Sequence, residues 1–208
     1  MAKPREWEVE SEVPNCLVQI EVDYQRAGCE GAIQHTGYQQ VQGGSEMRYD
    51  FSNIATNSNV PLESFYWHDQ IPTNAVTLNA IKTGTYNENL TYQIVYRTNK
   101  NSTWRVLAGG LNTLQSYDID CTGSRLGFAW DEYITEFRFE FGDVGAGFHS
   151  TSNPAILVTV SGRLPNGQQF ANRADAGGSY YGKWITSGYT WVTTVITPSR
   201  PVSYPKTG

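Results

Sequence analysis

The stretch Glu136-Phe137-Arg138-Phe139-Glu140-Phe141 decides the fold of this chain. Phenylalanines alternate with charged residues, so in an extended backbone all the rings lie on one side and all the charges on the other. Such a strand belongs to an antiparallel sheet that covers a core with one face and meets water with the other. The stretch therefore predicts a half-buried β-strand.

The same period of two recurs along the chain. Apolar residues alternate with polar ones at 47–51, 90–96, 156–160 and 191–195. Turn residues separate these runs, at 42–45, 83–84, 99–101, 108–110, 142–147 and 164–167. No stretch keeps an amphipathic helical pattern over three turns, and the best helical candidate is a short turn at 130–133. We predict an all-β fold, an immunoglobulin-like antiparallel β-sandwich with inserted strands.

Composition and charge agree with this fold and exclude some partners. The 208 residues include 20 Gly, 13 Tyr, 8 Phe and 6 Trp, and only 17% are charged, as is typical of strands joined by tight turns. The net charge of -5 argues against nucleic acid, because phosphate backbones are held by clustered Lys and Arg. No apolar run approaches the roughly 20 residues needed to cross a bilayer, so we expect no membrane insertion.

The domain organisation follows from the distribution of proline. We expect one elaborated sandwich domain over residues 1–196, with 1–40 either part of it or separate N-terminal strands. Residues 197–208 contain three prolines, which favour an extended linker. The start of the sequence lacks the apolar segment of a secretory signal, and we interpret the sequence as excised from a longer exported protein.

The cysteines are Cys16, Cys29 and Cys121, and their spacing does not match a metal site. Cys16 and Cys29 either form a disulfide across neighbouring strands and leave Cys121 free, or remain buried thiols. The sequence leaves both alternatives open. The histidines lie in unrelated segments, so we expect no metal and no cofactor.

No catalytic motif is found, neither a zinc-binding HExxH, nor a Walker A loop, nor a nucleophile elbow. The acidic pairs Asp118/Asp120 and Asp131/Glu132 have the composition of a glycosidase site. A β protein with 20 acidic residues offers such pairs on its solvated surface, however. We therefore predict no catalytic residues and a chain that is not an enzyme.

Residues 49–72 run from a strand through an Asn-rich turn into a second strand and end in Asp69-Gln70-Ile71-Pro72. This segment resembles the signature of the DUF11-type conserved repeat, a family of immunoglobulin-like sandwiches in bacterial surface proteins. The turn at 41–45 resembles the opening of those repeats, and 170–175 resembles their closing strand. The resemblance implies a surface module in which Asp69 has a structural role, accepting N–H groups at a strand-end turn.

The last residues, Tyr204-Pro205-Lys206-Thr207-Gly208, resemble the LPxTG sorting signal of Gram-positive surface proteins, with Tyr204 in place of the usual Leu. In that family a sortase thiol attacks the Thr–Gly bond, and the Thr carbonyl passes to an amine. An extended segment suits such a cleft because it has no internal hydrogen bonds to break. The resemblance implies a sortase and peptidoglycan or a pilin amine as partners, and an extracellular location anchored to the cell wall.

The leading interpretation is a non-catalytic structural or adhesive module, a stalk or pilin-like part of a sortase-anchored protein. The alternative is a carbohydrate-binding module, because Tyr181 and Trp184 would stack on a sugar if they are exposed. The partner would be a host or dietary glycan, or a protein. Sortase-linked modules often contain an isopeptide bond, for which Lys82 and Asn172 are a conceivable pair, although a surface role for Lys82 is the commoner one.

Overall fold

A computed structural model describes the chain at residues 17–22 and 38–197. Nearly all of its elements are strands. In chain order they are β1 (Leu17–Val22), β2 (Gln40–Gln42), β3 (Glu46–Asn57), β4 (Leu62–Gln70), β5 (Val76–Lys82), β6 (Thr85–Tyr86), β7 (Thr91–Thr98), β8 (Arg105–Asn112), β9 (Asp118–Asp120), α1 (Gly123–Leu126), β10 (Ile134–Val144), β11 (Ser150–Ser152), β12 (Ala155–Val160), β13 (Gln169–Tyr180) and β14 (Lys183–Ile196).

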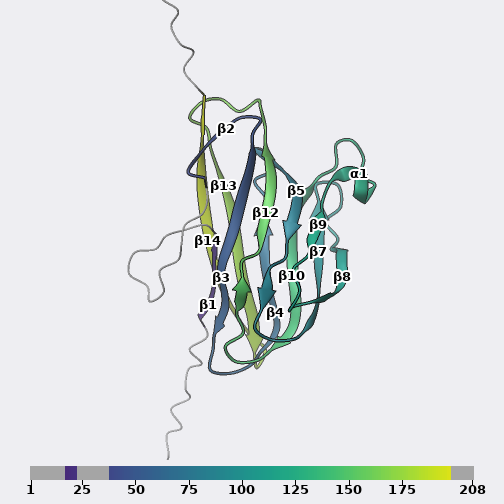
Figure 1. Ribbon diagram of the computed structural model, residues 1–208, viewed down its shortest axis with the longest axis vertical. Coiled ribbons are helices and arrows are strands. Elements are labelled where there is room, and N and C mark those ends of the chain that lie inside the picture. Colours follow the sequence, from purple (N-terminus) through teal and green to yellow (C-terminus); the bar gives the residue numbers. More distant parts are fainter. Residues whose placement is uncertain (1–16, 23–37, 198–208) are drawn as a thin grey trace, which may run out of the picture.

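The strands form two sheets packed face to face (Figure 1). The large sheet has seven strands in the order β2-β14-β13-β4-β10-β7-β8, and the small sheet has five in the order β1-β3-β12-β5-β9. Strands β6 and β11 pair separately. Among the described strands every pairing is antiparallel except that of β14 with β2. The prediction of an antiparallel β-sandwich is confirmed.

Aromatic side chains from both sheets meet in the core. Trp67 of β4 is fully buried, and its ring centroid lies 4.8 Å from that of Phe51 on β3 and 4.2 Å from that of Phe139 on β10. Phe137 and Phe141 of β10 are buried as well, as the alternating pattern predicts. Because Phe51 belongs to the small sheet and Trp67 to the large one, this cluster holds the two sheets together.

Three local predictions differ from the structure. The glycines at 108–110 lie inside edge strand β8, where the pairing with β7 shifts register between Tyr92 and Ile94. Glycine there permits an irregular strand instead of reversing the chain. Likewise β10 continues through Gly142, which has a φ of 71° and a register shift against β4. The best helical candidate, 130–133, is not helical: it contains a turn at 130–131, and the short helix α1 precedes it.

Asp69 also differs from the prediction, since it lies within β4 and not at a strand-end turn. Alternation along β4 turns Asp69 to the core side together with Trp67, and its carboxyl is fully buried. Its Oδ1 accepts a hydrogen bond of 2.6 Å from Nδ2 of Asn172, which is also fully buried. Among the described residues, Asp69 Oδ2 and Asn172 Oδ1 have no hydrogen-bond partner. Burial raises the pKa of Asp69 well above its ordinary value.

Several predicted features are placed differently or lie outside the described residues. Lys82 ends β5 and its Nζ pairs with Asp118 at 2.9 Å, whereas the Nδ2 of the buried Asn172 donates to Asp69, so each side chain has another partner. The proposed Cys16 and Cys29 disulfide and the sorting motif 204–208 fall outside the described ranges. No helix among the residues described is long and apolar enough to span a membrane.

Cys121 is expected to resist alkylation in the folded protein. It is buried as a free thiol, and burial raises its pKa to about 12, so little reactive thiolate exists near pH 8. Iodoacetamide followed by peptide mass spectrometry should leave Cys121 unmodified in buffer and modify it fully in urea. Rapid labelling without denaturant would contradict the burial.

Candidate functional site

The outward face of the large sheet carries an unusual set of side chains. The residues that alternate with the buried ones on its central strands are partly exposed and mostly charged or aromatic. They include Tyr66 and His68 on β4, Glu136, Arg138 and Glu140 on β10, Gln93 and Arg97 on β7, and Asp175 on β13. A sheet face that meets only water does not require aromatic side chains. We therefore take this face as the candidate site.

Aromatic rings and guanidinium groups follow one another across this face. The ring centroids of Trp184 and Tyr66 are 6.3 Å apart. The guanidinium carbon of Arg138 lies 5.8 Å from the Tyr66 ring centroid and 4.6 Å from that of Trp104. The guanidinium of Arg97 lies 4.0 Å over the same Trp104 ring. These residues, which we call the aromatic strip, come from β14, β4, β10, the β7–β8 loop and β7.

A groove of about 730 Å³ opens beside the strip. We call it the sheet groove. Its lining consists of Ser64, Phe65, Tyr66, Thr91, Tyr92, Gln93, Gly110, Arg138, Glu140, Phe141, Gly142 and Trp184. The buried rings of Phe65, Tyr92 and Phe141 belong to the core beneath it. The side chains that face outward into the sheet groove are those of Tyr66 and Trp184, which form an aromatic wall, and the polar ones of Gln93, Arg138 and Glu140.

The charges that line the sheet groove neutralise each other. Arg138 Nη2 lies 2.9 Å from Glu140 Oε2. Gln93 Nε2 donates to the other oxygen of Glu140 at 3.2 Å. These contacts hold three planar polar groups in a row, and they leave the groove with no net charge from its described lining.

His68 lies between two carboxylates. Its Nδ1 is 2.6 Å from Asp175 Oδ1, and its Nε2 is 3.5 Å from Glu136 Oε1. The hydroxyl of Tyr66 donates to Asp175 Oδ2 at 3.2 Å. Burial and then the charge of Asp175 raise the pKa of Tyr66 to about 12, so this hydroxyl stays a donor. Sequence reasoning treated His68 as an ordinary surface or strand-end residue, which the partly buried position corrects.

This histidine cluster does not have the geometry of a catalytic triad. Both ring nitrogens of His68 face carboxylates, so neither is free to activate a nucleophile. The acidic pairs considered from the sequence engage cations at the surface, Asp118 with Lys82 and Asp131 with Lys100 at 2.6 Å. Over the described ranges, no group of three or more His, Cys, Asp or Glu side chains is arranged to hold a metal ion.

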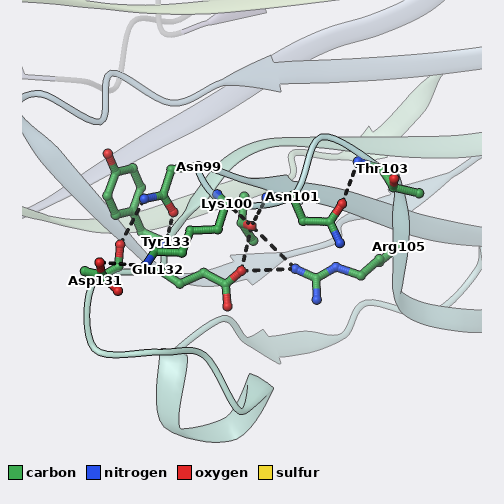
Figure 2. A network of polar contacts seen from close by, with 9 residues as sticks. Asn99, Lys100, Asn101, Thr103, Arg105, Asp131, Glu132 and Tyr133 are labelled. Atoms are coloured by element: carbon green, nitrogen blue, oxygen red, sulfur yellow. Dashed lines mark hydrogen bonds and ion pairs between the residues drawn. The ribbon is translucent and has the colours of Figure 1, made fainter.

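A polar network fixes the loop that carries Trp104 (Figure 2). Asn99 donates through Nδ2 to the carbonyl of Asp131 at 2.9 Å and accepts from the amide of Tyr133 at 3.0 Å. Glu132 Oε2 accepts from Thr98 at 2.8 Å and lies 3.5 Å from Arg105 Nη2. The β7–β8 loop is thus tied to the segment before β10, which holds the Trp104 ring over Arg97 and Arg138.

Both aromatic residues predicted to contact a glycan are exposed, but they lie in different hollows. Trp184 on β14 is 58% exposed and lines the sheet groove. Tyr181 is 88% exposed and lines a smaller hollow with Pro61 and Leu62. Tyr181 and Gly182 have φ values of 47° and 74°, which are suited to the tight turn between β13 and β14.

Sequence reasoning missed most of the sheet groove. Arg138 and Glu140 were recognised as the wet side of a strand, and that alternation was the available signal. Trp104 of the neighbouring aromatic strip lies in a loop. Tyr66 lies in the strand of the segment that resembles a repeat signature. Nothing local relates them to Trp184, because only sheet pairing brings these segments together.

No family model and no curated protein sequence matches the chain. Three solved structures with similar architecture are bacterial. The collagen binding subdomain of the Enterococcus faecalis surface protein ACE is 15% identical, with a TM-score of 0.30 over 76% of this chain and 92% of that one. A collagen-binding domain from a Staphylococcus aureus adhesin is 13% identical, with a TM-score of 0.32 over 78% and 95%.

The third is AggA, the major subunit of Escherichia coli aggregative adherence fimbriae type I, at 9% identity and a TM-score of 0.33 over 87% of this chain and 94% of that one. A further similar structure is AvmM, a macrocyclisation catalyst of alchivemycin A biosynthesis, at 7% identity and a TM-score of 0.29 over 90% and 93%. Likeness at this level carries no conclusion about function, since β-sandwiches have many unrelated functions.

Proposed function

We propose that this chain is a non-catalytic adhesive module of an extracellular bacterial surface protein. The observation that carries this proposal is the aromatic strip, a run of partly exposed rings and guanidinium groups, of which Trp184 is the most exposed, on an otherwise well-packed sandwich. Aromatic and arginine side chains are the types that contribute most to binding surfaces. Both nitrogens of His68 are engaged by carboxylates, which further favours binding over catalysis.

Anchoring to the cell wall by a sortase is the second part of the proposal. Its support is the sequence Tyr204-Pro205-Lys206-Thr207-Gly208 and the prolines that precede it. The last described strand, β14, carries Trp184 and ends at Ile196. A covalent bond at Thr207 would hold a binding face at the cell surface, whether the parent protein is a stalk or a pilin.

The anchoring proposal predicts a specific exchange reaction. Incubation with a Gram-positive sortase and a glycine-containing amine is expected to remove Gly208 and join the amine to Thr207, which intact mass measures directly. The Thr207→Ala variant should remain unreacted, because the sortase must attack the Thr carbonyl. An unchanged wild-type mass with sortases of several classes would refute anchoring at this motif.

The alternative function, a carbohydrate-binding module, is favoured by one specific observation. Trp184 is more than half exposed, whereas the sandwich core holds most of the other large rings. A ring that only filled the core would be buried. The two functions are compatible, since an adhesive module can act by binding a glycan.

A further inference from the structure

We propose that the sheet groove is a binding site for a neutral oligosaccharide, with Trp184 and Tyr66 as the stacking wall and Arg138, Glu140 and Gln93 as the hydrogen-bonding groups. This inference rests on the proposed adhesive function and names its ligand class. Together these residues do not form a sequence motif, because they come from four different strands, β14, β4, β10 and β7.

The Tyr66 ring of the aromatic wall packs beside Gly177, its cross-strand partner on β13. A Cβ added at Gly177 of β13 would lie 3.1 Å from Cε1 of Tyr66 and 2.8 Å from the carbonyl oxygen of Ile185. The missing side chain therefore lets the Tyr66 ring pack close to the sheet. The hydrogen bond from the Tyr66 hydroxyl to Asp175 fixes the other end of the ring. A ring fixed in this way, next to an exposed Trp184, offers an apolar platform that loses little entropy on binding.

The polar groups of the groove favour a ligand that is neutral and rich in hydroxyls. Arg138 and Glu140 form an ion pair, and Gln93 donates to the same carboxylate. An anionic ligand would meet Glu140, and a cationic ligand would meet Arg138. The planar side chains of Arg138, Glu140 and Gln93 keep further donors and acceptors, which match the paired hydroxyls of a sugar. Hydrogen bonds from sugar hydroxyls to the two charged groups would be the stronger ones.

The shape of the site also favours a glycan over a peptide. A peptide commonly binds a sheet by adding a strand to a free edge. Most of the sheet groove lies over β4, β10 and β7, each of which already has a neighbour on both sides, and the edge strand β8 contributes only Gly110. Away from the register shifts at 140–144 and 92–95, the backbone groups of β4, β10 and β7 are used in the ladders, so side chains are the main groups for recognition. Gly110 and Gly142 contribute no side chain to the lining, which keeps the groove open for a chain of sugar rings.

Isothermal titration of the whole chain with defined probes tests this inference. We use cellohexaose, laminarihexaose and mannohexaose as neutral probes, polygalacturonate as an acidic probe, and a triple-helical Gly-Pro-Hyp peptide. At least one neutral oligosaccharide is expected to bind. The Trp184→Ala variant should weaken that binding about tenfold or more, and Gln93→Ala about fivefold.

The Trp130→Ala variant is the matched control. Trp130 is 97% exposed, lies outside the groove and should leave binding unchanged. Circular dichroism would show that each variant is folded. The inference is overturned if no neutral probe binds, if the acidic probe or the peptide is preferred, or if Trp184→Ala and Trp130→Ala behave alike. Sortase exchange at Thr207 is read separately, so a chain that is anchored but binds no glycan would sink this inference alone.

Discussion

The Asp69→Asn variant is expected to be more stable than the wild type at neutral pH and equally stable near pH 4. Asp69 is fully buried, and desolvation raises its pKa well above the ordinary aspartate value. The folded state therefore binds a proton that the unfolded state releases as the pH rises. The stability that Asp69 contributes is fully present below the unfolded pKa, and it is lost as the pH rises through the raised folded pKa.

The size of this effect follows from proton linkage. Each pH unit between the ordinary pKa and the raised one costs the wild type about 1.4 kcal/mol of unfolding free energy. A protonated Asp69 can donate from Oδ2 to Oδ1 of Asn172, which would satisfy both atoms that now have no partner. An asparagine at position 69 can form the same pair of hydrogen bonds at every pH.

Urea denaturation at several pH values between 4 and 8 measures this difference. The gap between Asp69→Asn and the wild type should open as the pH increases. The control is Asp118→Asn, since the Asp118 side chain is 77% exposed and its ion pair with Lys82 lies at the surface. A gap that stays constant with pH would show that Asp69 keeps its charge in the folded state.

The Trp67→Ala variant is expected to lose about 3–5 kcal/mol of unfolding free energy. Trp67 is fully buried, and it contacts Phe51 of the small sheet as well as Phe137 and Phe139 of the large one. Its Nε1 also donates to the buried hydroxyl of Tyr86 at 3.2 Å. Alanine would leave a cavity where the two sheets meet, and the Tyr86 hydroxyl would keep only its hydrogen bond to the carbonyl of Thr83.

Chemical denaturation of Trp67→Ala beside Trp130→Ala isolates the effect of burial. Both changes remove one indole, but Trp130 is almost fully exposed and should cost no more than about 0.5 kcal/mol. Equal losses in the two variants would be inconsistent with Trp67 as the contact between the sheets. The denaturant midpoint gives the free energy when the slope is unchanged.

Local alternation predicted the strands correctly where one face is buried. Phe137, Phe139 and Phe141 are buried in β10, and Trp191, Thr193 and Val195 are buried in β14, as their period of two requires. This pattern depends only on the geometry of an extended backbone and on the removal of apolar side chains from water. The prediction was wrong where one residue type occurs both in turns and in strands. Gly109 and Gly110 indicate a turn by themselves, but pairing with β7 keeps them in a strand.

Residue order alone predicts the all-β class, the two-faced strands and the side of β10 that carries charge, because these are local properties. The position of Asp69 beside Asn172 in the core, and the lining of one groove by Trp184, Tyr66 and Arg138, depend on the three-dimensional fold. Sheet order differs from chain order, with β13 between β14 and β4. The physical reason is that sheet pairing and face-to-face packing bring distant segments into contact, and no local pattern encodes which strands become neighbours.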